Sequence, residues 1–363
     1  EKNMYTLDEF MAAVDQSEGI VCYGIGKRFH MFLSEFEGTS IIEKIRFCID
    51  AYAGNQSIKI ENRLLEVQGL SSLQIVRDHH YVLIITNLRY DQVVDDLTDQ
   101  GLLQGIQVFC FTHLYGMLLE ERAMNKWVPA NLRITKEQRI PKVIHYCWFG
   151  GNSIPDKYKK WMESWHKYCP DYEIVEWNES NYDVTKNAYM HEAYQCKKWG
   201  FVPDYARLDI IYNHGGIYMD TDVELVQNLD DLLYQEAYFG FERESTINLG
   251  LGFGAVKGSE IIRKLRDDYE MRHFLLQDGT MDLTASPVLQ TAIFQQKGVA
   301  LNGEYQVKQD FTIYPEKVLS GKCPYTRRVR LLSYTKSIHH YEATWTDHEF
   351  KERNRRFEQE MNS

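Results

Sequence analysis

The segment Gly215–Glu224, with the sequence GGIYMDTDVE, places two carboxylates directly after a short apolar run. Residues 217–219 are of types found in buried strands, where a charge is costly unless a partner compensates it. Asp220 and Asp222 are two residues apart, so on an extended backbone their side chains point to the same side. Carboxylates that converge in this way repel each other unless a cation lies between them. The segment therefore predicts a buried strand that ends at a cation-binding site.

Length and composition limit the classes of protein to which the chain can belong. A chain of 363 residues is long enough for two domains, and its formal net charge of -11 argues against a nucleic-acid partner. The 7 cysteines are scattered without a CxxC pair, which disfavours a zinc site or a disulfide framework and favours a reducing cytoplasm. Neither a signal peptide nor a membrane-spanning apolar run is expected, although peripheral work beside a membrane stays open.

The first part of the chain alternates predicted strands and helices. Apolar stretches at 19–23, 45–50, 79–86 and 106–111 are typical of strands, and a polar–apolar pattern over 90–99 is typical of a helix. Such alternation favours a parallel sheet, so residues 1–125 are predicted to form a small Rossmann-like α/β domain.

A glycine turn in this domain suggests a ligand only weakly. The turn Gly24-Ile25-Gly26 precedes a predicted helix and could cradle a phosphate, with Asp50 placed to hold a ribose. However, Phe29 stands where the dinucleotide-binding fingerprint has its third glycine. A structural turn is the preferred interpretation, and a dinucleotide site that would make the chain an oxidoreductase is the alternative.

A second domain is predicted after a polar linker at 126–139. It extends over 140–346, and the charged segment 347–363 is expected to be a surface helix or a frayed tail. Its first strand, 143–148, stops at a glycine pair, which places Trp148 at the rim of a cleft. The indole of Trp148 could stack on a nucleotide base, and a core tryptophan is an equally good interpretation of its position.

The helix predicted in VPDYARLDIIYNHGG leads directly into the strand that carries the two acids. Asp204 and Arg207 are three residues apart and share a face of this helix. They could form an ordinary surface ion pair. Alternatively, Arg207 could hold a phosphate or a sugar beside a metal bound to Asp220 and Asp222. Two acids with a metal, a guanidinium and an aromatic ring together indicate a site for a nucleotide diphosphate.

Four ordered motifs carry a resemblance to a known family. The chain contains IPKVIHYCWFGG, PDYAR, GGIYMDTDVE and a terminal IHHYEATW, and in this order they resemble glycosyltransferase family 32. The resemblance covers about residues 140–345 and not the first domain. It implies a GT-A type fold, a nucleotide-sugar donor with UDP-sugars favoured, a Mn²⁺ or Mg²⁺ ion, and retention of anomeric configuration.

The resemblance also implies roles for individual residues. Trp148 resembles the residue that stacks on the base, and Asp204 and Arg207 resemble a helix pair that contacts the ribose and sugar of the donor. Asp220 resembles the first acid of the DxD motif, which touches sugar, ribose or metal. Asp222 resembles the direct metal ligand.

The C-terminal motif matches the family less closely. His340 is similar in placement to a metal-binding histidine of related transferases, and His339, Glu342 or Thr344 could take that role instead. Trp345 is expected to contact the donor. Asn248 lies where relatives have a polar residue that faces the sugar, and a structural turn is an equal alternative.

The resemblance implies a metal-dependent retaining hexosyltransferase in surface polysaccharide synthesis, of the capsule or lipopolysaccharide type. The acceptor is expected to be a glycan or a lipid-linked molecule at the cytoplasmic face of the membrane. No second carboxylate stands out as a nucleophile, so the family favours front-face attack over double displacement. A metal-dependent hydrolase of nucleotide sugars is the competing function, although it would usually need more metal ligands.

Overall fold

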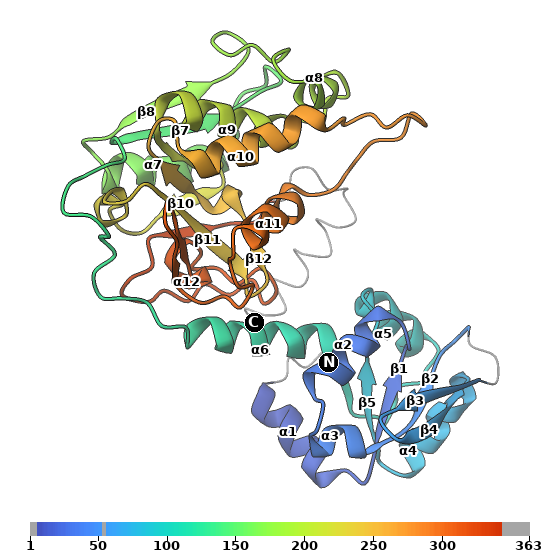
Figure 1. Ribbon diagram of the computed structural model, residues 1–363. Helices are drawn as coiled ribbons and strands as arrows, with labels where there is room; N and C mark the ends of the chain where they lie inside the picture. Colours follow the sequence, from blue (N-terminus) through green and yellow to red (C-terminus); the bar gives the residue numbers. More distant parts are fainter. Residues whose placement is uncertain (1–5, 53–55, 343–363) are drawn as a thin grey trace. The chain divides into compact units, whose positions relative to one another are not determined.

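The structure is a computed structural model that describes residues 6–52 and 56–342. It divides into two compact units between Glu120 and Glu121, within helix α6 (Phe111–Met124) (Figure 1). All seven cysteines lie in the described residues as free thiols. Among the helices of the described residues, none combines the length and the apolar character that a membrane span requires.

The first unit is built on a six-stranded sheet in the order β3-β4-β2-β1-β5-β6. Five strands are parallel. When they are numbered along the chain, their order across the sheet is 3-2-1-4-5, as in half of a Rossmann-type sheet. These are β1 (Ile20–Tyr23), β2 (Ile45–Ile49), β4 (Arg63–Gln68), β5 (Val82–Ile85) and β6 (Val108–Cys110). The edge strand β3 (Gln56–Ile60) pairs with β4 in antiparallel fashion, a hairpin that the sequence pattern did not predict.

The helices of this unit cover the parallel strands, and β1 and β5 are buried along their whole length. The helices are α1 (Leu7–Gln16), α2 (Lys27–Glu35), α3 (Ser40–Glu43), α4 (Leu73–Asp78) and α5 (Tyr90–Asp99). Gly24 follows β1 with a φ of 92°, and a Cβ at this position would overlap the Asn87 side chain. The positive φ and this close packing explain why glycine is required at position 24, with no need for a bound ligand. They do not test the dinucleotide alternative.

The second unit contains a mixed sheet in the order β14-β15-β11-β13-β9-β7-β8, with β12 paired to β11. β7 is parallel to β8 and β9, β11 is parallel to β15, and the other pairs are antiparallel. The strands are β7 (Val143–Cys147), β8 (Glu173–Trp177), β9 (Gly216–Tyr218), β11 (Ala237–Arg243), β12 (Thr246–Ile247), β13 (Phe253–Ala255), β14 (Gln306–Val307) and β15 (Thr312–Tyr314). A separate pair joins β10 (Val223–Leu225) to β16 (Ser337–His339).

Helices pack on both faces of this sheet and enclose two hydrophobic clusters. Residues that follow one another in and after β9 alternate between them, because side chains of a strand alternate between faces. Ile217 and Met219 belong to the cluster that contains Trp165 of α7 (Asp156–Tyr168). Tyr218 belongs to the cluster formed with α8 (Ala188–Gln195), α9 (Val202–His214), α10 (Glu260–Asp267) and α11 (Ser286–Gln296). In Figure 1, α9 and α10 lie side by side.

The predicted α/β class is therefore confirmed, with a Rossmann-like first unit and a mixed sheet of the kind expected of a GT-A type fold in the second. Segment 126–139, predicted as a linker, lies against the second unit, where the backbone N–H groups of Ile134 and Arg139 donate to the carbonyls of Tyr234 and Leu233. The predicted charged tail at 347–363 lies outside the described residues.

Candidate active site

A cavity of about 950 Å³ opens in the second unit beside the carboxyl ends of β7 and β9. It is lined by six of the eight predicted site residues, namely Trp148, Asp204, Arg207, Asp220, Asp222 and Asn248. Of the other two, His340 is not among the lining residues, and Trp345 lies outside the described residues, as does the alternative Thr344.

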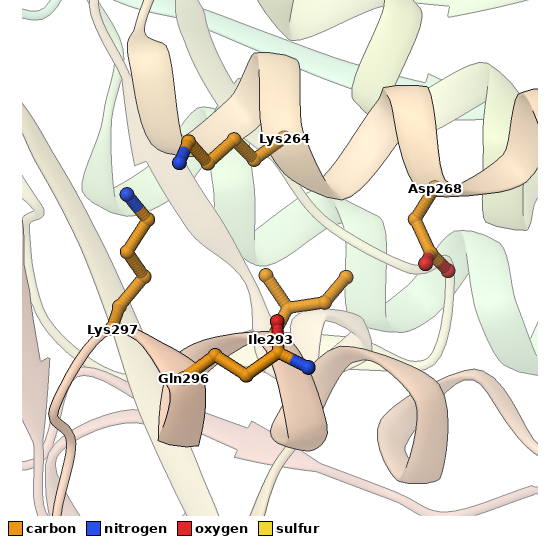
Figure 2. A pocket seen from close by; sticks show the side chains of 5 residues that line it. All are labelled: Lys264, Asp268, Ile293, Gln296 and Lys297. Atoms are coloured by element: carbon orange, nitrogen blue, oxygen red, sulfur yellow. The ribbon is translucent and has the colours of Figure 1, made fainter.

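A second cavity, of about 350 Å³, lies between α10 and α11. Figure 2 shows Lys264 and Lys297 with their ammonium groups pointing toward each other. The proximity of Lys297 lowers the pKa of Lys264. Asp268 supplies the only carboxylate of this lining, and no aromatic ring takes part. The larger cavity, which holds the paired acids, is therefore the candidate active site.

Two glycines connect α9 to the strand that carries the acids. Gly215 and Gly216 have φ angles of 71° and 106°, which disfavour any residue with a side chain. A Cβ on Gly216 would lie 2.8 Å from the Val143 carbonyl oxygen and 3.0 Å from Nε2 of His145. The tight turn is thus required for α9 to run directly into β9, and it brings Arg207 and Asp220 to the same cavity.

Asp220 and Asp222 are joined by a histidine from a distant strand. β10 and β16 pair with Val223 opposite His339. Nε2 of His339 lies 3.3 Å from Oδ1 of Asp222. One ligand atom from each of Asp220, Asp222 and His339 lies within 4.8 Å of the other two. The three side chains therefore form a single candidate metal group.

His340, the histidine predicted for this role, points elsewhere. Its ring stacks on Trp161 with centroids 3.9 Å apart, and its Nε2 lies 2.9 Å from Oε2 of Glu224. Successive residues of a strand point to opposite faces, so only one of two adjacent histidines can reach the acids. The structure places His339 beside the acids, and His339 was one of the three alternatives. Glu342 contributes its backbone N–H to Oδ2 of Asp222, at 3.0 Å.

The three groups suit a hard divalent cation. Carboxylate oxygens are the ligands that Mn²⁺ and Mg²⁺ prefer, and imidazole is a common ligand of transition-metal ions. Ligands held at about 2.1 Å from one ion lie within about 4.2 Å of one another. Because the observed limit is 4.8 Å, small side-chain movements would close the group around an ion.

Burial and neighbouring charges give Asp220 and Asp222 different pKa values. Burial and the charge of Asp222 raise the pKa of Asp220, while Arg207 opposes this. Burial also acts to raise the pKa of Asp222, but the adjacent His339 outweighs it and brings that pKa to about 2. Asp222 in turn raises the pKa of His339 against the effect of burial. Asp222 is therefore the acid that stays ionised most readily.

Arg207 and Asp204 do not form a surface pair. They are 4% and 3% exposed, and Nη2 of Arg207 lies 3.2 Å from Oδ1 of Asp204. Nη1 of Arg207 lies 3.5 Å from Oδ1 of Asp220, and its guanidinium lies 5.0 Å from the ring centre of Tyr218. Burial raises the pKa of Asp204 to about 6 although Arg207 lowers it. The interpretation of this pair as an ordinary surface ion pair is thus wrong. Arg207 instead connects Asp204 of the helix to Asp220 of the acid pair.

Trp148 follows β7 and lies at the edge of the cavity. It is half-buried against a hydrophobic cluster, and it also lines the cavity. Its Nε1 donates a hydrogen bond to the carbonyl of Asn152, at 2.6 Å. Part of the ring is therefore available at the rim, where the donor base was expected.

Among the cavity-lining residues that sequence reasoning missed, Glu242 and Ser286 contact predicted ones. Glu242 accepts a hydrogen bond from Nδ2 of Asn248, at 2.8 Å. The hydroxyl of Ser286, at the start of α11, interacts with Asp204 and lowers its pKa. Neither residue stands in a recognisable spacing with the DxD motif, and β11 and α11 bring them to the cavity only through tertiary packing.

Comparisons with known proteins bear on this region. Residues 155–239 match the family model described as "Glycosyltransferase sugar-binding region containing DXD motif". Inositol phosphoceramide mannosyltransferase 3 of Schizosaccharomyces pombe is 34% identical over 103 residues, which cover 27% of this chain and 29% of that protein. An uncharacterized glycosyltransferase of Acanthamoeba polyphaga mimivirus is 33% identical over 100 residues, which cover 26% and 40%.

Subversion of eukaryotic traffic protein A of Legionella pneumophila is 27% identical over 173 residues, which cover 38% of this chain and 26% of that protein. The chain thus spans less than half the length of each of these curated relatives. Among solved structures, the PaToxG glycosyltransferase has a TM-score of 0.35 and 18% identity, covering 50% of this chain and 76% of that chain. The similarity to glycosyltransferases rests on the sequence matches.

The matched residues include Asp204, Arg207 and both acids of the pair, which lie together in the cavity. Residues 155–239 of the second unit are therefore similar to the DXD-containing sugar-binding region of glycosyltransferases, which confirms the resemblance to glycosyltransferase family 32 predicted from the motifs.

Proposed function

We propose that the chain is a metal-dependent glycosyltransferase that moves a hexosyl group from a nucleotide-diphosphate sugar to an acceptor hydroxyl. The observation that carries the proposal is the convergence of Asp220, Asp222 and His339 with the Arg207 guanidinium in one cavity. A metal ion held by the first three residues, together with Arg207, would favour the departure of a diphosphate, because negative charge grows on the leaving group as the glycosidic bond breaks.

The residues of the chain divide the work of binding and charge stabilisation. Asp220, Asp222 and His339 would hold a Mn²⁺ or Mg²⁺ ion, which supplies positive charge to the diphosphate. Arg207, held by Asp204, is oriented toward the same region before the donor arrives, so little reorganisation is required at the moment of reaction. Trp148 would stack on the donor base at the rim.

Retention of configuration by front-face attack remains the favoured course. In that course the acceptor hydroxyl bonds to the anomeric carbon on the face from which the diphosphate departs, and it gives its proton to an oxygen of that diphosphate. No side chain then has to act as nucleophile or as general base. The side chains then have to orient the donor and shield the bond that breaks from water.

The acceptor is proposed to be a glycan or a lipid-linked molecule, with the chain associated peripherally with the cytoplasmic face of a membrane. The name of the S. pombe relative states that it mannosylates inositol phosphoceramide, and this adds an inositol-bearing lipid and a mannosyl donor to the candidates. A role in capsule or lipopolysaccharide synthesis is the other candidate. Because every lining residue of the cavity belongs to the second unit, the first unit is proposed to serve placement rather than chemistry.

The test is a panel of UDP- and GDP-sugars with Mn²⁺, in which nucleotide release is followed with and without lipid and glycan acceptors. We expect one donor to be consumed, faster with its acceptor, and consumption to stop in EDTA and in the Asp222→Asn variant. The matched control is Asp171→Asn, which changes an exposed acid paired with Lys142 outside the cavity. Consumption that no acceptor accelerates would favour the hydrolase, and consumption of no donor would refute the proposal.

A further inference from the structure

Glu242 is a buried carboxylate of the cavity that has no part in the candidate metal group. It lies near the end of β11, is 7% exposed, and lines the cavity. Its Oε2 lies 3.2 Å from Nε of the neighbouring Arg243, and its Oε1 accepts the hydrogen bond from Asn248. A buried carboxylate is costly unless its oxygens are engaged, so these contacts explain how Glu242 is tolerated and raise the question of what it does.

The contact with Glu242 determines the orientation of the Asn248 amide. A carboxylate only accepts hydrogen bonds, so the Nδ2 group of Asn248 has to face Glu242. Oδ1 of Asn248 is thereby turned toward the next loop, where it accepts a hydrogen bond from the backbone N–H of Gly250, at 2.7 Å. In this way Asn248 caps the short helix η3 (Leu249–Leu251).

The capped turn lies directly against the first acid of the DxD motif. A Cβ on Gly250 would lie 2.6 Å from Oδ2 of Asp220 and 3.0 Å from Oδ1 of Asn248. The backbone of Gly250 therefore packs directly against the Asp220 carboxylate, and only glycine allows so close an approach. Arg207 contacts the other oxygen of Asp220, Oδ1, at 3.5 Å. The turn and Arg207 together limit the rotation of this carboxylate.

We propose that Glu242 is a positioning residue of the candidate metal site: through Asn248 it holds the Gly250 turn against Asp220 and so orients that carboxylate toward the cation. The proposal rests on the proposed function, since it assigns a purpose to the orientation of Asp220. Partners that orient a metal ligand typically affect metal affinity or activity by about 10- to 100-fold. Glu242 touches neither the cation nor the donor in this assignment.

The test compares Mn²⁺ affinity, measured by calorimetric titration of the full chain without donor, with kcat for donor turnover. Glu242→Ala removes the acceptor of the Asn248 amide, and we expect Mn²⁺ to bind at least tenfold more weakly and kcat to fall by a similar factor. Glu242→Gln keeps a carbonyl oxygen that accepts from Asn248, so it should restore most of both. Gly250→Ala, which displaces Asp220 directly, should weaken Mn²⁺ binding without any change at Glu242.

Glu244→Ala is the matched control, because Glu244 follows the same strand but pairs with Arg122 and Lys126 and does not line the cavity. Circular dichroism serves to check that each variant is folded. Unchanged Mn²⁺ affinity in Glu242→Ala, with an active wild type, would overturn this proposal alone. Glu242→Gln as inactive as Glu242→Ala, with normal Mn²⁺ affinity, would instead make Glu242 a catalytic carboxylate. A wild type that neither binds Mn²⁺ nor consumes a donor would overturn both proposals.

Discussion

Replacing Arg207 with Met should destabilise the fold in a pH-dependent way. Arg207 is 4% exposed and lies 3.2 Å from Asp204 and 3.5 Å from Asp220. Methionine fills much of the same volume but leaves both carboxylates without their cation. Removal of one partner from a buried ion pair costs about 3–5 kcal/mol of unfolding free energy. The side chain of Asp220 is 29% exposed and can be partly hydrated, so Asp204, at 5%, should dominate the loss.

The sign of the pH dependence follows from the pKa of Asp204, which burial already raises to about 6. Loss of Arg207 should raise it further, because the guanidinium opposes the effect of burial. A carboxyl whose pKa is higher in the folded than in the unfolded state costs nothing at low pH, where it is protonated in both states. The cost grows by about 1.4 kcal/mol for each pH unit between the unfolded pKa and the folded pKa, and it is constant above the folded pKa. We therefore expect a loss of about 3 kcal/mol at pH 8 and at least about 1 kcal/mol less at pH 5.5.

The assay is urea unfolding followed by circular dichroism in EDTA at both pH values. Arg207→Lys keeps the charge without the planar fork and should recover part of the stability. Addition of Asp204→Asn to Arg207→Met should recover most of it. Arg263→Met is the control, because the Arg263 side chain is 43% exposed where it pairs with Glu260 and Asp267, and it should cost less than about 1 kcal/mol at either pH. Equal losses for Arg207→Met at both pH values would refute the reasoning. With donor and metal present, kcat should also fall by about 100-fold or more.

Three further predictions concern the metal, the donor and the turn behind the acids. His339→Ala should weaken Mn²⁺ binding, whereas His340→Ala should not, and the reverse result in titration calorimetry would restore His340 as the ligand. Trp148→Ala should raise the KM for the donor by roughly tenfold, because base stacking is worth about 1–3 kcal/mol. Replacement of the exposed Trp127 with Ala should leave this KM unchanged. A large fall in melting temperature without a change in KM would make Trp148 a core residue. Burial lowers the pKa of His145 to about 4, below its unfolded value of about 6.5, so stability should fall by roughly 3 kcal/mol as pH drops between these values. His145→Gln should flatten that part of the stability profile, and an unchanged slope would contradict the buried neutral state of this histidine.

Local patterns in the sequence were sufficient for the features that one or two neighbouring segments determine. The alternation of apolar strands and amphipathic helices predicted the parallel sheet of the first unit, because residues close in sequence decide which face of each element is apolar. The run from Asp204 through Arg207 to the acids predicted one site, since a helix, two glycines and a strand leave little freedom between these side chains. The hairpin of β3 and β4 was not predicted because most of its residues are exposed or half-buried, although a single polar residue separates Ile58 from Ile60 and Leu65 from Val67.

The tertiary structure decided the features that depend on strand register and packing between distant segments. The motif IHHY offers two histidines, and only the pairing of β10 with β16 determines that His339 faces Asp222 while His340 stacks on Trp161. A shift of one residue in that register would exchange the two rings, because side chains of a strand alternate between its faces. Glu242 likewise reaches the cavity because β11 lies two strands from β9 in the sheet. Such pairings arise from the shape and burial of the whole core, so a local pattern can supply the ligand types of a site but not which of two neighbours turns toward it.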